Sequence, residues 1–216
     1  MQLMSCSASA SWQSMANYYE APDIAPWAQS LVKIIRGSLY GLENLRLDVY
    51  SESSIPRDVF QQCFNLIESN LKHLYRQSAL GWSSVDKQEE MREQGLIYVT
   101  LSQHEHHATR VLGFVSFMHT EENGEDVVYC YEIQLASRIQ GLGVGKSLMQ
   151  VVESYAAHCA APKCMLTVFS ANRAVEFYRK IGYTLAENSP QDRKLRNGVS
   201  KPSYYILEKA VQHAGV

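Results

Sequence analysis

The sequence predicts an α/β fold with a mixed central sheet flanked by helices, and three observations support this class. Apolar residues in the first third recur at helical spacing, the middle holds three β-rich runs, and strand and helix patterns alternate towards the C-terminus. With 216 residues, of which 46% are hydrophobic, the chain can bury a substantial core. We expect a single domain over residues 21–216, after a loosely ordered leader over residues 1–20.

Two amphipathic helices are expected before the sheet. The first begins near Ile24 and carries Trp27, Leu31, Ile34 and Ile35 at helical spacing. The second begins at Pro56, because proline is favoured in the first turn of a helix. Its apolar stripe consists of Val59, Phe60, Cys63, Phe64, Ile67, Leu71 and Leu74.

The middle of the chain reads as a β-meander. Strands are expected over 96–102, 111–119 and 127–136, with turns at 104–110 and 120–126. Helical spacing resumes over 148–156, a buried strand follows at 163–170, and a final strand lies at 203–209. Between these two strands, residues 172–182 predict a short helix that Gly182 closes at its C-terminus.

Composition and charge narrow the function classes. The net charge of −2 gives no global argument for nucleic-acid binding, and no stretch is apolar enough to cross a membrane. The five cysteines are odd in number and form no CxxC pair, which favours reduced thiols inside the cell. The N-terminus lacks the charged start and apolar run of a signal peptide. We therefore expect a cytoplasmic and nuclear protein with no nucleic-acid or membrane partner.

The segment RIQGLGVGKS (138–147) holds three glycines between a predicted strand and a predicted helix. Glycines let backbone N–H groups approach a phosphate, and a helix N-terminus adds unpaired donors with a favourable dipole. A P-loop is one interpretation, but it needs a glycine where Gln140 stands. The spacing Gln140-x-x-Gly143-x-Gly145 favours instead the pyrophosphate of another cofactor.

That spacing, followed by LTVFSANRAVEFYRKIGY (166–183), resembles the Gcn5-related N-acetyltransferase superfamily. The resemblance implies that family's fold, with acetyl-CoA as co-substrate and no metal. It implies that Asn172 binds the pantetheine arm and that Tyr178 approaches the sulfur; a helix N-cap and a core aromatic are the structural alternatives. The implied cofactor-binding residues are Ile133, Gln134, Leu135, Gln140, Gly141, Leu142, Gly143, Val144, Gly145, Lys146, Asn172 and Tyr178.

A narrower resemblance runs from about Phe60 to Glu208 and rests on LYRQSALGW (74–82), VVYCYEIQL (127–135) and MLTVF (165–169). These stretches look like the histone-specific N-terminal acetyltransferase D family. Histone tails beginning Ser-Gly-Arg-Gly are then the implied substrate, acetylated on the α-amine without an auxiliary subunit. The resemblance implies Glu132 as catalytic base, the Leu135 N–H as oxyanion donor, and a peptide cleft lined by Tyr75, Tyr129, Tyr131, Thr167 and Tyr204.

Two positions depart from that family's pattern. Leu80 stands where a tryptophan is expected, which changes one side of the cleft. Thr120 stands where a peptide-contacting aspartate is expected, and Glu121 or Glu122 is the acidic neighbour that could replace it.

The chemistry of Glu132 can also be argued without the family. An α-amine has a pKa of about 7.7–8.0, so a carboxylate must accept its proton before the amine attacks a thioester. Strict strand alternation puts Glu132 on the face of Cys130 and Gln134, opposite Tyr131, whereas a bulged strand could bring Tyr131 and Glu132 together. The structural alternative is a strand-edge salt bridge. Charged residues are depleted in strands, which favours catalysis.

Other functions stay open at this point. A lysine or small-amine acetyltransferase would share the fold, although an amine with a pKa of about 10.4 demands stronger deprotonation. An inactive CoA-binding interaction module would keep the loop and use the aromatic cleft for a partner. The HEHH stretch (104–107) has no further ligand set, so we interpret it as a solvated turn and not as a metal site.

Overall fold

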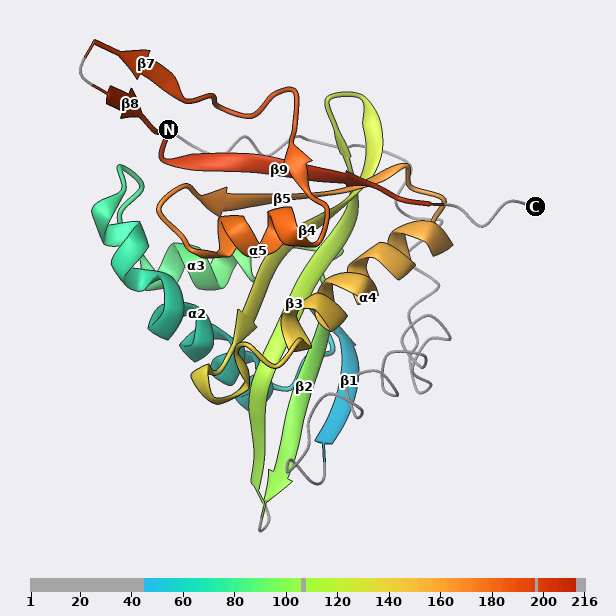
Figure 1. The fold of residues 1–216 in the computed structure, drawn as a ribbon. Coiled ribbons are helices and arrows are strands. Elements are labelled where there is room, and N and C mark those ends of the chain that lie inside the picture. The colour runs from blue at the N-terminus through green and yellow to red at the C-terminus, as the bar shows by residue number, and fades with distance from the viewer. Residues whose placement is uncertain (1–44, 106–107, 197, 213–216) are drawn as a thin grey trace.

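The computed structural model describes residues 45–105, 108–196 and 198–212. Seven strands form one mixed sheet in the order β1-β2-β3-β4-β5-β9-β6 (Figure 1). The bounds are β1 Leu45–Ser51, β2 Ile97–Glu105, β3 Ala108–Glu122, β4 Glu125–Leu135, β5 Lys163–Phe169, β6 Thr184–Leu185 and β9 Tyr204–Ala210. The α/β class with a mixed central sheet is confirmed.

The centre of the sheet is where β4 and β5 run parallel and then separate. Their register covers only Val127–Cys130 of β4, opposite Lys163–Leu166 of β5. Beyond Cys130, β4 continues to Leu135 beside β3, while β5 stays paired with β9 up to Phe169. The two strands diverge visibly in Figure 1. We call this feature the β4/β5 divergence.

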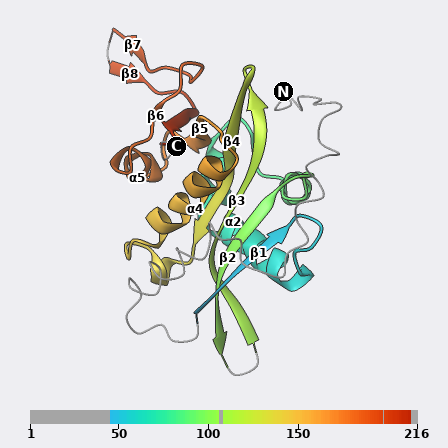
Figure 2. The same ribbon diagram turned by 90° about the vertical axis from the view of Figure 1, so that its right-hand side faces the viewer.

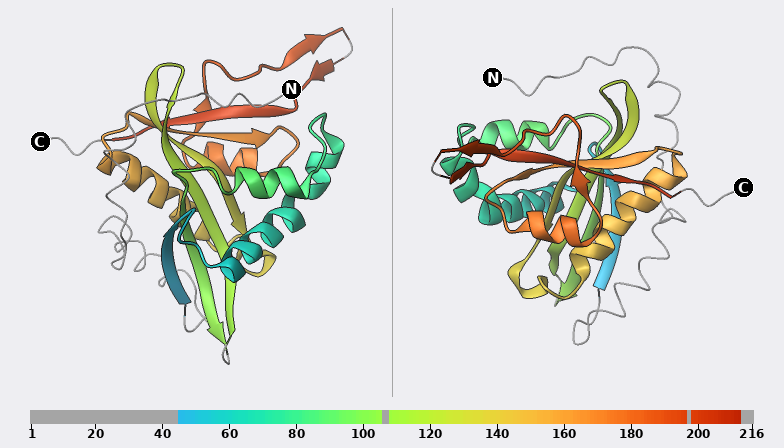
Figure 3. Two further views of the ribbon diagram at one scale, coloured as in Figure 1. Left: turned by 180° about the vertical axis from the view of Figure 1, so that it is seen from behind. Right: turned by 45° about the horizontal axis from the view of Figure 1, so that its top comes forward.

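Helices cover both faces of the sheet, as Figure 3 shows. Helices α4 (Val144–His158) and α5 (Ala174–Lys180) pack on one face over the larger apolar core. Helices α2 (Arg57–Gln77) and α3 (Ser84–Glu90) border the opposite face, where a second core holds the α2 stripe. The predicted stripe is confirmed at its buried members Val59, Phe60, Cys63, Phe64 and Ile67.

The hairpin turns are shorter than the sequence predicts. β2 and β3 extend into the expected 104–110 turn, so only residues 106–107 separate them. At the other end of β3, Asn123 and Gly124 have φ of 54° and 82°, as a two-residue hairpin turn requires. Gly182 closes α5 with a φ of 98°, as predicted. Figure 2 shows the long β2–β3–β4 meander from the side.

Five elements have no counterpart in the sequence prediction. They are β1, α3, the two-residue strand β6, and a separate hairpin of β7 (Arg193–Leu195) and β8 (Gly198–Ser200), which projects from the body in Figure 2. The predicted leader and the helix expected near Ile24 lie outside the described residues. In the described part, no helix is long and apolar enough to span a bilayer.

Candidate active site

The glycine segment connects β4 to α4 beside the β4/β5 divergence. After a short 3-10 turn (Ser137–Ile139), Gly141 and Gly143 have φ of 76° and 84°, a backbone that side chains with a Cβ rarely adopt. A Cβ on either glycine would meet no atom within 4 Å, so the segment is open on its outer side. Leu142 and Lys146 are exposed, whereas the Val144 side chain is buried in the larger core.

The N-terminus of α4 points backbone donors at this open segment. Gly143 is the N-cap, and no side chain caps the helix. The first intrahelical bond is donated by Ser147 to the Gly143 carbonyl, which leaves the N–H groups of Val144, Gly145 and Lys146 without an intrahelical partner. Unused N–H groups with a positive dipole end are the chemistry that a pyrophosphate needs. The residues present therefore fit the cofactor that the sequence implies.

Gly145 has a second reason to be glycine. A Cβ there would lie 3.3 Å from the Phe177 ring and 3.6 Å from Leu135. Close packing of α4 on α5 and β4 therefore favours Gly145 whether or not a phosphate is bound, because a Cβ there would need the Phe177 ring to shift by a few tenths of an ångström.

Several predicted cofactor residues make structural hydrogen bonds. The Gln140 side chain donates to the Leu135 carbonyl at 3.0 Å, and Asn172 Oδ1 accepts the Ala174 N–H at 2.9 Å. The N-cap of α5 is Arg173 and not Asn172, but Asn172 still accepts the first N–H of the helix, so a contact with a pantetheine arm would come from its Nδ2 group. Tyr178 is buried in the larger core, and burial raises its pKa well above the ordinary value. It therefore stays a neutral phenol.

A β-bulge in β4 sets the faces of the central side chains. Phe117 pairs with Cys130 and the adjacent Ser116 pairs with Glu132, so Tyr131 is the extra residue. Cys130 packs in the larger core, whereas Tyr131 packs against the α2 core. Glu132 contacts Lys87 of α3. Strict alternation with Cys130 on the face of Glu132 is therefore wrong, and the bulged alternative is confirmed.

Glu132 is a buried carboxylate, 6% exposed. Its Oε1 lies 2.6 Å from the Lys87 ammonium, and its Oε2 accepts a hydrogen bond of 2.8 Å from the Gln134 amide. Gln134 in turn accepts from Asn70 of α2 at 3.0 Å. The carboxylate does form an ion pair, but in the middle of the sheet and not at a strand edge.

The five residues predicted to line a peptide cleft lie on the α2 side of the sheet and fall into two groups, Tyr129 with Tyr131 and Thr167, and Tyr75 with Tyr204 on either side of Phe169. The Tyr129 hydroxyl and Thr167 Oγ1 are 2.6 Å apart, and the Tyr129 and Tyr131 rings pack edge to face at 5.5 Å. Tyr75 packs edge to face on Phe169 at 4.8 Å, and Phe169 pairs in register with Tyr204. We call Tyr75, Tyr129, Tyr131, Thr167, Phe169 and Tyr204 the tyrosine surface.

Acidic side chains act electrostatically on the tyrosine surface. Burial raises the pKa of Tyr129 to about 12, its hydrogen bond to Thr167 lowers the pKa, and the negative charge of Glu122 raises it again. Tyr131 has a raised pKa because of burial, with smaller contributions from Glu93 and Glu122. Glu121 is exposed, whereas Glu122 is partly buried. Of the two acidic neighbours that the sequence offers beside Thr120, Glu122 is the one whose charge acts on both tyrosines.

The Leu135 backbone faces the β4/β5 divergence. The Ala136 N–H donates to the Leu112 carbonyl at 2.7 Å. Because successive residues of an antiparallel strand point their N–H and C=O groups to alternate sides, Leu135 turns its own N–H and C=O away from β3. The Leu135 carbonyl accordingly accepts from the side chains of Asn70 and Gln140. Its N–H points the same way, into the space that β5 leaves.

Asn70, Lys87 and Phe169 belong to the site but are missing from the sequence prediction. Leu80, at the departure from the family pattern, is 55% exposed.

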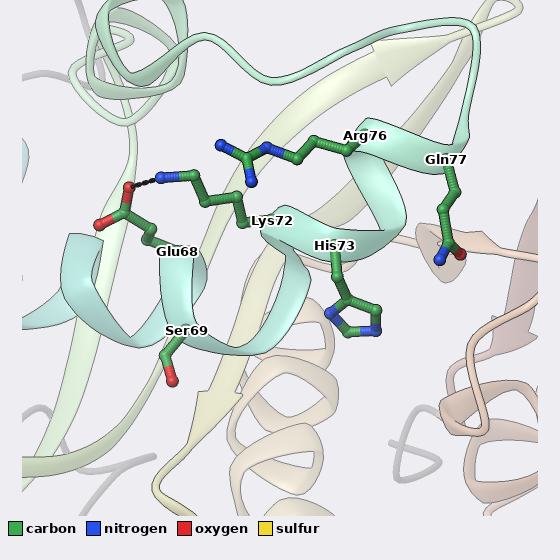
Figure 4. Close-up of a pocket in the computed structure, with 6 residues that line it drawn as sticks. All are labelled: Glu68, Ser69, Lys72, His73, Arg76 and Gln77. Carbon is green, nitrogen blue, oxygen red and sulfur yellow. Dashed lines mark hydrogen bonds and ion pairs between the residues drawn. The ribbon is translucent and has the colours of Figure 1, made fainter.

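A cavity of about 430 Å³ lies along α2 next to the site and is lined by Glu68, Ser69, Lys72, His73, Arg76 and Gln77. All six residues belong to α2, so one helix supplies the whole lining. In Figure 4, Ser69 and His73 project to one side of α2 and Lys72 and Arg76 to the other. Among the described residues, no group of three or more His, Cys, Asp or Glu side chains could hold a metal ion.

Comparisons with known proteins decide the family. The sequence model of the Acetyltransferase (GNAT) family matches residues 60–183, more than half of the chain. The chain belongs to the GNAT acetyltransferase family. The P-loop interpretation is thereby replaced, since residues 138–147 lie inside the GNAT match.

Individual relatives agree with this family. N-alpha-acetyltransferase 40 of Saccharomyces cerevisiae is 31% identical over 68% of this chain, and the match spans 63% of that relative's length. The ribosomal-protein-S18-alanine N-acetyltransferase of Escherichia coli is 15% identical with a TM-score of 0.52, covering 79% of this chain and 97% of that one. An aminoglycoside 6′-N-acetyltransferase complexed with coenzyme A is 16% identical with a TM-score of 0.55, covering 79% and 99%. The two structures establish the GNAT fold.

Proposed function

We propose that this GNAT protein is an N-alpha-acetyltransferase that transfers acetyl from acetyl-CoA to the α-amine of a protein N-terminus. The observation that carries the proposal is Glu132. It is a buried carboxylate placed by a β-bulge beside Tyr131, next to a strand divergence and a glycine segment that fits a pyrophosphate. The likeness to N-alpha-acetyltransferase 40 supports the same reaction class.

Each step of the reaction has a residue in reach of the β4/β5 divergence. Bound acetyl-CoA supplies the activated acetyl group. Glu132 accepts the proton of the α-ammonium, which frees the nitrogen lone pair for attack. The Leu135 N–H points into the divergence and can donate to the oxygen that gains charge. The second proton of the nitrogen passes to the departing sulfur as the carbon–sulfur bond breaks, so CoA leaves as the thiol, and the neutral phenol of Tyr178 can donate a hydrogen bond to that sulfur.

The tyrosine surface supports an extended peptide with small first residues. Phenol hydroxyls and ring faces offer hydrogen bonds and apolar contact together, which suits a Ser-Gly start and excludes bulky side chains. We propose Glu122, whose negative charge acts on Tyr129, as the acidic partner for an arginine at the third position. We therefore propose histone tails beginning Ser-Gly-Arg-Gly as substrates. Action without an auxiliary subunit remains a prediction of the sequence resemblance, and a location in cytoplasm and nucleus remains a prediction from the cysteine pattern and composition.

The test uses acetyl-CoA and four peptides that each carry a lysine further along: one beginning Ser-Gly-Arg-Gly, the same peptide with its α-amine blocked, one with Leu for Ser, and one with Ala for Arg. We expect the first peptide to be acetylated on its α-amine at the full rate. The peptide with Ala for Arg should react with a higher KM. The blocked peptide and the peptide with Leu for Ser should give no product. Mass spectrometry locates the acetyl group. Equal acetylation of a lysine in the blocked peptide would replace the proposal by a lysine acetyltransferase, and binding of CoA without any product would indicate an inactive module.

A further inference from the structure

Lys87 on α3 is a buried lysine in direct contact with the proposed base. Its side chain is 5% exposed. The ammonium lies 2.6 Å from Glu132 Oε1, 2.7 Å from Glu90 Oε1 and 3.1 Å from the Tyr75 hydroxyl. An ammonium has three donors, and here each has an acceptor. The contacts therefore fix Lys87 in one position between α2, α3 and β4.

The same contacts decide the state of Glu132. Burial disfavours the ionised form of a carboxyl group, whereas a cation within about 4–6 Å favours it. A protonated carboxyl group cannot take the proton of an incoming ammonium. Lys87 on Oε1 and Gln134 on Oε2 each occupy one oxygen, which also fixes the orientation of the carboxylate.

We propose that Lys87 is a positioning residue for acetyl transfer: it keeps Glu132 ionised and oriented inside the protein, with Glu90 as a second counter-ion. The inference rests on the proposed function of Glu132 as base. The proton that leaves the substrate ammonium goes to Glu132, and Lys87 keeps its own three protons throughout. Lys87, Glu132 and Glu90 together carry a net charge of −1 before the transfer. The arriving proton brings this charge to zero, so the transfer leaves the buried cluster neutral.

Lys87 does not itself act as base. Burial opposes its charge, but Glu132, Glu90 and Tyr75 outweigh burial and raise the pKa of Lys87 well above its ordinary value. It therefore stays protonated where an α-amine titrates.

The charge of Glu132 also acts on other titratable groups, which come from α2, β2, β4 and α5 and lie on both faces of the sheet. Burial raises the pKa of each, so these phenols and this thiol stay neutral. They are Tyr75, Tyr98, Cys130 and Tyr178. Lys87 and Glu90 remain as the charged neighbours, and two substitutions of opposite effect can separate their roles.

The experiment compares pH profiles of kcat for the full chain with acetyl-CoA and the Ser-Gly-Arg-Gly peptide. Lys87→Met removes the cation, so the acidic limb should move to higher pH by about 1–3 units, with activity recovering above it. Glu90→Gln removes a competing anion, so the limb should move to lower pH. Lys87→Arg keeps the charge and should restore a profile near that of the unsubstituted protein. The peptide amine titrates alike in all cases, so differences belong to the protein.

Two further measurements guard against trivial outcomes. Lys209→Met removes another ion-paired lysine, which bridges β9 to Glu153 of α4 at 2.8 Å, and should leave the profile unchanged. If Lys87→Met alone does not fold, Lys87→Met/Glu90→Gln keeps the net charge of the cluster and should still show the upward shift.

A second readout does not require activity. Carbon-13 NMR of labelled glutamate follows the ionisation of the Glu132 carboxyl with pH, and Lys87→Met should raise its midpoint. Unchanged midpoints, or shifts of the same sign in Lys87→Met and Glu90→Gln, would overturn the inference. Shifted midpoints in a protein that acetylates no peptide would support the role of Lys87 in ionising Glu132 and reject the proposed function.

Discussion

Replacing Glu132 by Gln tests the proposed base while changing little else. The amide keeps the size of the side chain, and Lys87 keeps Glu90 and Tyr75 as acceptors. One of the two donors that meet Glu132, either Lys87 or the Gln134 amide, would then face an NH2 group. Gln134 cannot simply turn over, because its Oε1 already accepts from Asn70 at 3.0 Å. We therefore expect a loss of about 1–3 kcal/mol in the free energy of unfolding, the cost of one badly paired buried group.

The effect on catalysis should be much larger than the effect on binding. Loss of a general base lowers turnover by about 10²–10⁴-fold. That range corresponds to about 2.7–5.4 kcal/mol in the activation barrier. The glycine segment and the α4 N-terminus do not touch Glu132, so the dissociation constant of acetyl-CoA should stay the same.

The assay measures initial rates with saturating acetyl-CoA and the Ser-Gly-Arg-Gly peptide, and calorimetry gives the affinity for acetyl-CoA. Glu153→Gln is the matched control, because this carboxylate also pairs with a lysine, Lys209, but lies on α4. Turnover of Glu132→Gln within a few-fold of the unsubstituted protein at all pH values would show that another group takes the proton. In that case the argument from burial and pairing would be wrong.

Three further predictions concern the loop, the core and the thiols. Gly143→Asn should weaken acetyl-CoA binding in calorimetry, because its side chain enters the open glycine segment. It should not lower Tm, because asparagine tolerates the left-handed backbone. Gly145→Val should lower Tm, because the valine side chain meets Phe177. Ile67→Ala should cost about 2–5 kcal/mol in urea unfolding, since Ile67 is fully buried, and a smaller loss would mean that the α2 core relaxes. A thiol reagent followed by mass spectrometry should label Cys159 before the three buried cysteines of the described chain, and labelling in the reverse order would contradict the burial.

Patterns local in sequence predicted the main elements well. The α2 stripe, the three meander strands and the glycine segment each repeat a period or a spacing within about twenty residues, and each is present as expected. β1 was missed although LRLDVYS alternates apolar and polar residues at its start. The short β7 and β8 strands carry no pattern long enough to detect.

Lys87 shows what local patterns cannot give. SVDKQEE is short and strongly polar, which is typical of a solvated surface segment. The lysine is buried because α3 packs beside β4 and α2. Glu132 of β4 and Tyr75 of α2 supply acceptors for its ammonium. Those partners lie 45 and 12 residues away along the chain, so a short window around Lys87 contains its contact with Glu90 but not the partners on β4 and α2.

The bulge at Tyr131 has a consequence for how this strand can change over time. Alternation resumes in its original phase on both sides of the extra residue, so Tyr129 and Glu132 would keep their faces if Tyr131 were deleted. The face of Glu132 is therefore set by its pairing with Ser116 and not by which side chain stands at the inserted position. On the proposed function, exchange of Tyr131 would change which N-termini fit while the carboxylate keeps its face.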